Sequence, residues 1–244
     1  MSATMEKRVE VRATADEVWS AISTGEGLVR WFAPEARVKP GVGGEVYMAW
    51  GGEGGASRIQ AWEPGRRLVH VDSVGEPPGT IDYRVEPGPG GTTALRILQT
   101  GFAPGSDMEA SLDRGWDMLL GNLRVALERG RGLPCAFGFA SARPGKEEDA
   151  WARLLGPGVL AQRGTLAPRA RVSLAPGGEA IEAEVDLWRP GIAFAVERLD
   201  RPERIGFTFE PSGLVYAYRL AWGLSPEAAD EMKAAWAALF ARQA

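Results

Sequence analysis

Several short segments of the chain alternate apolar and polar residues, as half-buried β-strands do. Residues 7–13, KRVEVRA, show this period of two, and Thr14 and Glu17 then form a capping box ahead of Val18 and Trp19. The sequence therefore predicts a strand that is followed at once by a helix.

Five more strand-like segments follow, each bounded by Gly or Pro. They are GGEVYMAW (43–50), ASRIQAW (56–62), RRLVHVDS (66–73), GTIDYRVE (79–86) and TTALRILQT (92–100). Short strands separated by turn residues predict an antiparallel meander. We interpret the Gly-rich residues 51–57 as a flexible hairpin connection, because they open no helix and lack the Lys-Ser/Thr ending of a phosphate loop.

A long amphipathic helix is predicted from Asp107 to Arg129. Apolar residues recur there at three- and four-residue spacing, at Leu112, Trp116, Leu119, Leu120, Leu123 and Leu127. Gly130 and Gly132 end the pattern. A strand, a short helix, a meander and a long helix together predict an α+β fold in which the helix covers a curved sheet.

The second half of the chain repeats this order in a compressed form. The pattern predicts a strand over 137–141, a helix over 146–155, further strands over 165–222 and a helix over 225–243. Ser225 is placed to cap the last helix, and Pro226 suits its first position.

Three tryptophan pairs mark the repeat. They are Trp19 and Trp151, Trp62 and Trp188, and Trp116 and Trp236, whose separation falls from 132 to 126 to 120 residues. A steadily falling offset is expected of a copy that has lost loop residues. We predict two tandem domains, 1–132 and 133–244, the second being shorter and divergent. The alternative is an unrelated β-rich tail that extends the first sheet.

The first half also resembles a known family. The matching segments are VEVRATADEVWSAIS (9–23), GLVRWFAP (27–34), VGGEVYMAW (42–50), IQAWEPGRRLVHV (59–71), LRILQTGF (95–102) and RGWDMLLGNLRVALERG (114–130). They are similar to homologues of the heat-shock protein 90 ATPase activator, within the START-like helix-grip superfamily. The resemblance implies a bent antiparallel sheet that grips a long C-terminal helix, often around a cavity.

Members of that family differ in activity, so the resemblance implies less about function. It includes lipid or polyketide binders, a few cyclases and co-chaperone modules. Gln99 stands where relatives frequently carry His, and Asp72 stands where an aromatic residue is common. Any chemistry that relatives perform at these two positions is therefore not implied for this chain.

Composition narrows the classes of function. With 45% hydrophobic and 25% charged residues, the chain has the composition of an ordinary globular protein. Its net charge of −4 argues against a nucleic-acid partner, because phosphate binding needs clustered Lys and Arg. The sequence has neither a membrane-span pattern nor the apolar core of a signal peptide, so we expect a cytoplasmic protein. Arg far outnumbers Lys, which is typical of a GC-rich bacterial genome.

Few residues are suited to catalysis or metal binding. His70 is the single histidine and Cys135 the single cysteine, so a two-histidine metal site and an internal disulfide are both excluded. No Gly-x-Ser-x-Gly elbow accompanies His70. We therefore expect no catalytic residue, no metal and no cofactor, and we place His70 in the core or against a ligand.

Aromatic residues are dense in the first domain, where both a core and an apolar ligand site would use them. Trp19 and Trp116 belong to the apolar faces of the two predicted helices, so they are assigned to the core. The predicted ligand-binding residues are Trp31, Trp50, His70, Tyr83 and Gln99. Strand alternation gives Tyr83 and Gln99 apolar neighbours on their own faces, so these two side chains would supply polar groups.

These observations favour a binding protein that encloses a small apolar or aromatic ligand over an enzyme. One alternative is an enzyme of the polyketide cyclase or dehydratase type, in which His70, Tyr83 or Asp72 assists proton transfer. The other is a regulatory module that stimulates a chaperone ATPase or contacts another protein partner. We place the cavity in the first domain, because residues 27–44 are long enough to roof an opening and residues 156–164 are not.

Overall fold

The computed structural model describes residues 3–72, 78–143, 147–157 and 159–241. The chain divides into two compact units, Met1–Arg131 and Gly132–Ala244, and each is described by itself. Among the described helices, none is both long and apolar enough to cross a membrane.

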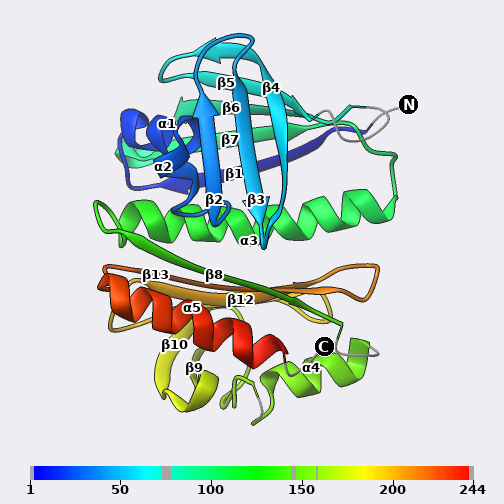
Figure 1. Ribbon diagram of the computed structural model, residues 1–244, viewed down its shortest axis with the longest axis vertical. Coiled ribbons are helices and arrows are strands. Elements are labelled where there is room, and N and C mark those ends of the chain that lie inside the picture. Colours follow the sequence, from blue (N-terminus) through cyan, green and yellow to red (C-terminus); the bar gives the residue numbers. More distant parts are fainter. Residues whose placement is uncertain (1–2, 73–77, 144–146, 158, 242–244) are drawn as a thin grey trace. The chain divides into compact units, whose positions relative to one another are not determined.

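The first unit contains one antiparallel sheet and three α-helices within its described residues. Its elements are β1 (Met5–Val11), α1 (Ala15–Ser23), α2 (Gly25–Leu28), β2 (Glu35–Lys39), β3 (Glu45–Trp50), β4 (Glu53–Glu63), β5 (Arg67–Asp72), β6 (Thr80–Pro87), the 3-10 turn η1 (Pro89–Gly91), β7 (Thr93–Gln99) and α3 (Asp107–Glu128). The strands lie in the order β1-β7-β6-β5-β4-β3-β2, and α3 packs against β1 (Figure 1).

The second unit has a sheet of its own. Its elements are β8 (Cys135–Ala142), α4 (Glu147–Leu155), β9 (Arg171–Leu174), the 3-10 turn η2 (Pro176–Gly178), β10 (Ile181–Arg189), β11 (Ala193–Arg198), β12 (Glu203–Phe209), β13 (Val215–Trp222) and α5 (Pro226–Ala241). The strands lie in the order β8-β13-β12-β11-β10-β9, and α5 packs against β8 (Figure 1).

The two sheets have the same strand order once β2 is set aside. In each unit the first strand lies at one edge beside the last strand, and the long helix packs against that first strand. The predicted α+β class, two tandem units that each pair a curved antiparallel sheet with a long helix, is confirmed. The alternative of a tail that extends the first sheet is wrong, because the described strands β8 to β13 form a separate sheet.

Local irregularities repeat along with the strand order. The pairing of β4 with β5 shifts register between Ile59 and Ala61, and the pairing of β10 with β11 shifts between Val185 and Leu187. The two bulges are 126 residues apart, which is the separation already found for Trp62 and Trp188. Because a bulge is a specific feature of a strand, its repetition supports a common origin of the two units.

The matched tryptophans make matched contacts. The rings of Trp19 and Trp62 meet edge to face at 5.2 Å and 73°, and those of Trp151 and Trp188 do so at 5.5 Å and 77°. In both units a tryptophan of the short helix therefore packs on a tryptophan of the bulged strand. Two of the three predicted pairs thus occupy equivalent places in their sheets.

The helices α1 and α3 begin where the sequence predicts, whereas the short helix α2 was not predicted. The Thr14 hydroxyl accepts a hydrogen bond from the Glu17 amide at 3.3 Å, and the Glu17 carboxylate accepts one from the Thr14 amide at 2.7 Å. The Ser106 hydroxyl caps α3 by accepting from the Glu109 amide at 3.2 Å. Each such cap stabilises its helix by about 1 kcal/mol.

Two predicted connections differ in the structure. Residues 53–57 belong to β4, and only Gly51 and Gly52 form the hairpin turn, with φ angles of 59° and 91° that favour glycine. The segment 27–44, predicted as a connection that roofs an opening, contains the edge strand β2 at Glu35–Lys39. Its EARVK sequence is a polar edge strand whose pattern is weak in isolation.

Candidate ligand site on the inner face of the first sheet

One face of the first sheet is directed at α3, and we call it the inner face. Leu68 pairs with Tyr83 and Tyr83 with Ile97 across β5, β6 and β7, and all three side chains are buried. The ring of Trp116, from α3, meets the ring of Tyr83 at 6.1 Å and 76°. This contact identifies the face of the sheet that α3 covers.

Phe32 joins three other aromatic rings over this face. Its ring lies 4.9 Å from that of Trp31, 5.8 Å from that of Trp50 and 5.6 Å from that of Trp116. These rings come from the segment after α2, from the end of β3 and from α3. Three separate parts of the first unit therefore meet around Phe32.

Tyr83 continues this chain of rings across the sheet. It contacts Trp116 on one side and stacks on His70 at 5.7 Å and 24° on the other. Together the six rings form what we call the ring cluster, which consists of Trp31, Phe32, Trp50, His70, Tyr83 and Trp116. Aromatic contacts of this geometry each add about 0.5–1.5 kcal/mol beyond the burial of apolar area.

Trp31 is fixed by its own hydrogen bonds. Its indole N–H donates to the carbonyl of Ala21 at 2.9 Å, and its own carbonyl accepts from the Asn122 amide at 3.2 Å. The side chain is fully buried. Since its polar atom already has a partner, Trp31 offers only the surface of its ring to a ligand.

Gln99 and Trp116 form a buried pair. The indole N–H of Trp116 donates to Oε1 of Gln99 at 2.5 Å, and only 8% of Gln99 is exposed. Gln99 ends β7, and its partner across β6 is Ile81. This hydrogen bond holds the amide of Gln99 on the inner face, next to the ring cluster.

The Tyr83 hydroxyl differs from the polar groups around it. Tyr83 is 1% exposed, and its hydroxyl forms no hydrogen bond with any residue in the described part of the chain. Burial raises the pKa of Tyr83 well above its ordinary value. The phenol is therefore neutral at physiological pH and able to donate a hydrogen bond.

His70 lies on β5 with 2% of its surface exposed. It pairs with Ile59 on one side and with Ile81 on the other, so it lies within the sheet and its ring stacks on Tyr83. Asp72 ends the same strand, and its side chain lies outside the residues that the structure describes.

All five predicted site residues lie in one connected group. Trp31, Trp50, His70 and Tyr83 belong to the ring cluster, and Gln99 joins it through Trp116. Sequence reasoning assigned Trp116 to the core and gave Asn122 no role. The helical spacing of Trp116 predicted its burial, but the sequence carries no signal for the acceptor that its indole N–H finds.

In the second unit, other residue types occupy the positions that correspond to Tyr83, His70 and Gln99. The row Leu68, Tyr83 and Ile97 of the first sheet corresponds in register to Phe194, Phe207 and Ala217 of the second. Two residues further along the strands, His70, Ile81 and Gln99 correspond to Val196, Ile205 and Arg219. The hydroxyl and the imidazole are thus replaced by apolar side chains, and the amide by a guanidinium.

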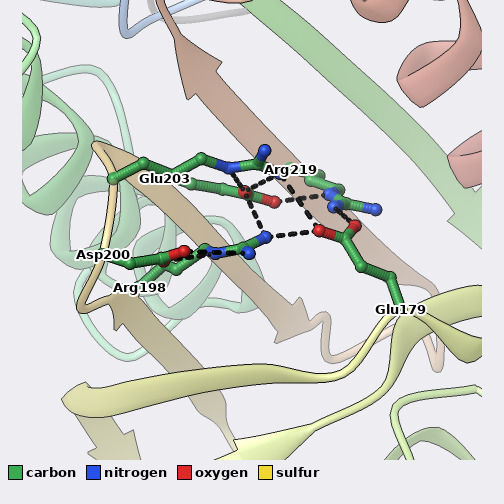
Figure 2. Close-up of polar contacts among 6 residues, drawn as sticks. Glu179, Arg198, Asp200, Glu203 and Arg219 are labelled. Carbon is green, nitrogen blue, oxygen red and sulfur yellow. Dashed lines mark hydrogen bonds and ion pairs between the residues drawn. The ribbon is translucent and has the colours of Figure 1, made fainter.

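Arg219 belongs to an ionic network at one end of the second sheet (Figure 2). Its guanidinium donates to Glu203 at 2.7 Å and to Glu179 at 2.8 Å. Arg198 contacts the same two carboxylates, at 2.5 Å for Glu179 and 3.3 Å for Glu203, and Asp200 at 2.6 Å. Glu203, whose side chain has no exposed surface, therefore lies between cations.

The charges of this network balance. Arg201 is its sixth member and donates to Glu203 at 2.7 Å, so three arginines face three carboxylates. Burial would raise the pKa of Glu179, but hydrogen bonds from Arg198 and Arg219 outweigh it and hold that pKa below its ordinary value. The polar groups at this end of the second sheet thus satisfy one another.

A metal site does not emerge from the described side chains. Within the described ranges, no group of three or more His, Cys, Asp or Glu side chains is placed to hold a metal ion. The arrangement of the first unit is instead a buried cluster of rings beside the Tyr83 hydroxyl and the Gln99 amide, and Lys7 lies on the same face with Asp113 and Asp117 of α3 as its partners.

Residues 12–128 match the family described as Activator of Hsp90 ATPase homolog 1-like protein. The first unit is a domain of this family. The match covers α1 to α3 with the whole meander between them. It agrees with the START-like helix-grip fold that the sequence resemblance implied, whereas the second unit lies outside the matched residues. No curated protein matches the chain by sequence.

Several solved structures are similar to parts or all of the chain. The Aha1 dimer from Colwellia psychrerythraea is 21% identical, covers 53% of this chain and 99% of its own, and has a TM-score of 0.49. CalU16 from Micromonospora echinospora is 28% identical over 50% of this chain and 73% of its own, with a TM-score of 0.41. DynU16, described as a putative protein in the dynemicin biosynthetic locus, is 17% identical over 98% and 96%, with a TM-score of 0.46.

Proposed function

We propose that the first unit binds a small apolar, ring-containing molecule against the ring cluster of its inner face. The observation that carries the proposal is the ring cluster, in which rings from separate parts of the first unit meet on the face that α3 covers. The Tyr83 hydroxyl lies within this cluster and can donate a hydrogen bond to such a ligand.

The surroundings of Tyr83 support an apolar ligand. Its neighbours Leu68 and Ile97 are buried aliphatic residues, and Trp116 and His70 present ring faces and edges. Ligand sites in proteins combine mainly apolar and aromatic walls with few polar groups, and this combination is present here. Each buried ligand methylene would contribute about 0.8 kcal/mol before the costs of association.

The chemistry of Tyr83 favours binding over the cyclase or dehydratase alternative. Because burial raises its pKa, the phenol does not ionise near neutral pH and does not act as a base. Cyclase chemistry would have to rely on His70 or Asp72 for proton transfer, and the side chain of Asp72 lies outside the described residues. The family description suggests a different function, that of a module that regulates a chaperone or another protein partner. That function requires no ligand at Tyr83.

A fluorescence titration of the full chain with N-phenyl-1-naphthylamine, a neutral apolar probe, tests the proposal. We expect saturable binding to the wild type. The substitution Tyr83→Trp should reduce the affinity at least tenfold, because the larger ring occupies the surface against which the ligand packs.

Tyr47→Trp is the matched control. Tyr47 lies on β3 with its ring under the guanidinium of Arg37, 4.2 Å from the ring centre, and it is not part of the ring cluster. This variant should bind the probe as the wild type does. If the wild type does not bind, or if Tyr83→Trp binds equally well while staying folded, the proposal is wrong and the interaction-module alternative gains support.

A further inference from the structure

The turn that joins β3 to β4 has a close counterpart in the second unit. Residues 49–55, AWGGEGG, correspond to residues 175–181, APGGEAI, at the same separation of 126 residues that relates the two bulges. The glycines at the third and fourth positions have φ angles of 59° and 91° in the first unit, and of 63° and 94° in the second. The two turns are therefore equivalent in length and in backbone conformation.

The two segments differ at their last residue. Gly55 pairs with Met48. Its counterpart Ile181 pairs with Leu174, is 3% exposed and belongs to the core of the second unit. Alternation along β4 from Ile59 places Gly55 on the inner face. Gly55 is exposed, and within the described residues no atom lies within 4 Å of the place that a Cβ would take. The inner face is thus open where a buried side chain closes the second unit.

The two turns also differ in how they are held. The carboxylate of Glu179 accepts from Arg198 at 2.5 Å and from Arg219 at 2.8 Å, so ion pairs tie the second turn to its sheet. Glu53 has the equivalent position in the first unit. It is exposed and makes no ion pair within the part of the chain that the structure describes. The first turn therefore lacks the contact that holds the second.

Trp50 connects the first turn with the ring cluster. It ends β3, pairs with Glu53 across the turn and places its ring 5.8 Å from that of Phe32. Trp50 is only half-buried, whereas the other five rings of the cluster are each no more than 5% exposed. A ligand therefore needs an opening to reach those rings, and Trp50 is the ring that borders solvent.

We infer that the ligand enters the first unit past the β3–β4 turn, through the gap at Gly55, with Trp50 as the gate. This inference rests on the proposed function and specifies how access to that site is controlled. The glycines beside Trp50 tolerate backbone torsions that other residues avoid, which allows the turn to move. In the second unit, Ile181 and the ion pairs of Glu179 close the same route.

The test introduces the residue of the second unit into the first. Gly55→Ile suits a strand, because the φ angle of Gly55 is not in the left-handed region. Binding of N-phenyl-1-naphthylamine to the full chain is followed by stopped-flow fluorescence. Closing an entrance raises the barrier without changing the bound state, so Gly55→Ile should slow association and dissociation at least about tenfold and change the Kd less than about threefold.

Arg58→Ile is the matched control. It introduces the same side chain into the same strand, but alternation places Arg58, which is exposed and pairs with Glu45, on the opposite face. This variant should bind the probe with the rate constants of the wild type.

A second readout needs no ligand. In amide hydrogen exchange of the full chain, residues 51–53 should exchange faster than residues 177–179, because local opening is easier where no ion pair holds the turn. Glu179→Gln should accelerate exchange at 177–179 several-fold and leave 51–53 unchanged. Equal exchange at the two turns of the wild type would remove the contrast on which the gate rests.

The outcomes separate the inference from the function on which it rests. If the wild type binds the probe and Gly55→Ile leaves both rate constants unchanged, the entrance lies elsewhere and apolar binding stands. A weaker affinity with an unchanged association rate would place residue 55 against the bound ligand and overturn its role in access. If the wild type does not bind the probe, the proposed function fails and the inference fails with it.

Discussion

The two sheets share a strand order and a bulge, yet they treat polar groups on equivalent strands in opposite ways. In the first sheet, Tyr83 and Gln99 place a neutral hydroxyl and a neutral amide on the inner face, and the amide accepts from Trp116. In the second, Phe207 has lost the hydroxyl, and Arg219 is paired with two carboxylates. The comparison teaches that the same strand positions carry neutral polar groups beside aromatic rings in one unit, and apolar rings or paired charges in the other.

The packing of aromatic side chains also differs between the two units. In the second unit Trp151 stacks on Phe209 at 4.5 Å and contacts Phe207 at 5.8 Å, and Phe207 contacts Phe194 at 5.4 Å. The position of Phe209 corresponds in register to Val85 of the first sheet, and that of Phe194 to Leu68. Larger rings thus fill the second interior at positions where the first unit has aliphatic side chains.

The largest expected effect concerns the independence of the two units. A fragment of residues 1–132 should unfold cooperatively in urea, because α3 already completes the first sheet and the second sheet contains none of its strands. Circular dichroism and tryptophan fluorescence should report one coincident transition. A molten fragment beside a cooperative full chain would mean that the halves share a core, and the comparison of separate units would then fail.

Replacing the corresponding polar residues should give unequal losses of stability. Arg219→Met removes a cation from the fully buried Glu203, so we expect the free energy of unfolding to fall by about 3–5 kcal/mol. Gln99→Met leaves only the indole N–H of Trp116 without its acceptor, at a cost of about 1–3 kcal/mol. Urea unfolding of both variants measures the difference, and equal losses would show that the ionic network is not specially dependent on Arg219.

Exchanging the hydroxyl between the units sharpens the comparison further. Phe207→Tyr places a hydroxyl among Phe194, Trp151 and other buried rings, which should cost about 1–3 kcal/mol of unfolding free energy. Tyr83→Phe removes a hydroxyl that has no protein partner and should change stability by less than about 1 kcal/mol. Thermal unfolding of the two variants measures both effects. If Tyr83→Phe proves the more destabilising, the hydroxyl has a structural role in the first unit.

The smallest effect is a pH dependence that belongs to the second unit. The pKa of Glu179 in the folded chain lies below its ordinary value of 4.5. Its contribution to stability is therefore complete above pH 4.5 and is lost as the pH falls through the lowered folded value. Because the Glu179 side chain is 43% exposed, this contribution should stay below about 1 kcal/mol.

Glu179→Gln should remove that part of the acid sensitivity, and Glu231→Gln, on the exposed side of α5, should not. Unfolding midpoints in urea between pH 3 and pH 7 measure the effect. Parallel pH profiles for the wild type and Glu179→Gln would show that the carboxylate is not ionically coupled to Arg198 and Arg219.

Much of the fold could be predicted from periodicity. The meander, the capping box at Thr14 and the helix over 107–128 follow from local patterns that tertiary contacts do not override. The matched tryptophans identified the repeat because large rings mark equivalent core positions. The edge strand β2 was missed, since the five residues of EARVK, with little burial, give too weak an alternation to distinguish a strand from a connection.

The residues predicted for a ligand site lie together in the structure, but the hydrogen bonds that join them to their neighbours were not predicted. Alternation placed Tyr83 and Gln99 on buried faces, and the structure agrees. The hydrogen bond from Trp116 joins residues 17 positions apart and depends on how α3 lies on the sheet, which no local pattern specifies. The ionic network likewise brings Glu179 to Arg219 across 40 positions, so charge patterning along the chain gave no sign of it.

The most direct test of the central claim uses the indoles of Trp116 and Trp236, one in each unit, as reporters. Trp116 Nε1 donates to Gln99 beside the proposed ligand site, and Trp236 Nε1 donates to the Ala217 carbonyl at 3.3 Å in the second unit. In a ¹⁵N NMR titration of the full chain with N-phenyl-1-naphthylamine, we predict saturable shifts of the Trp116 indole and the Gln99 side-chain amide, with the Trp236 indole unmoved. Shifts confined to Trp236, or no saturable shift at either indole, would contradict the account.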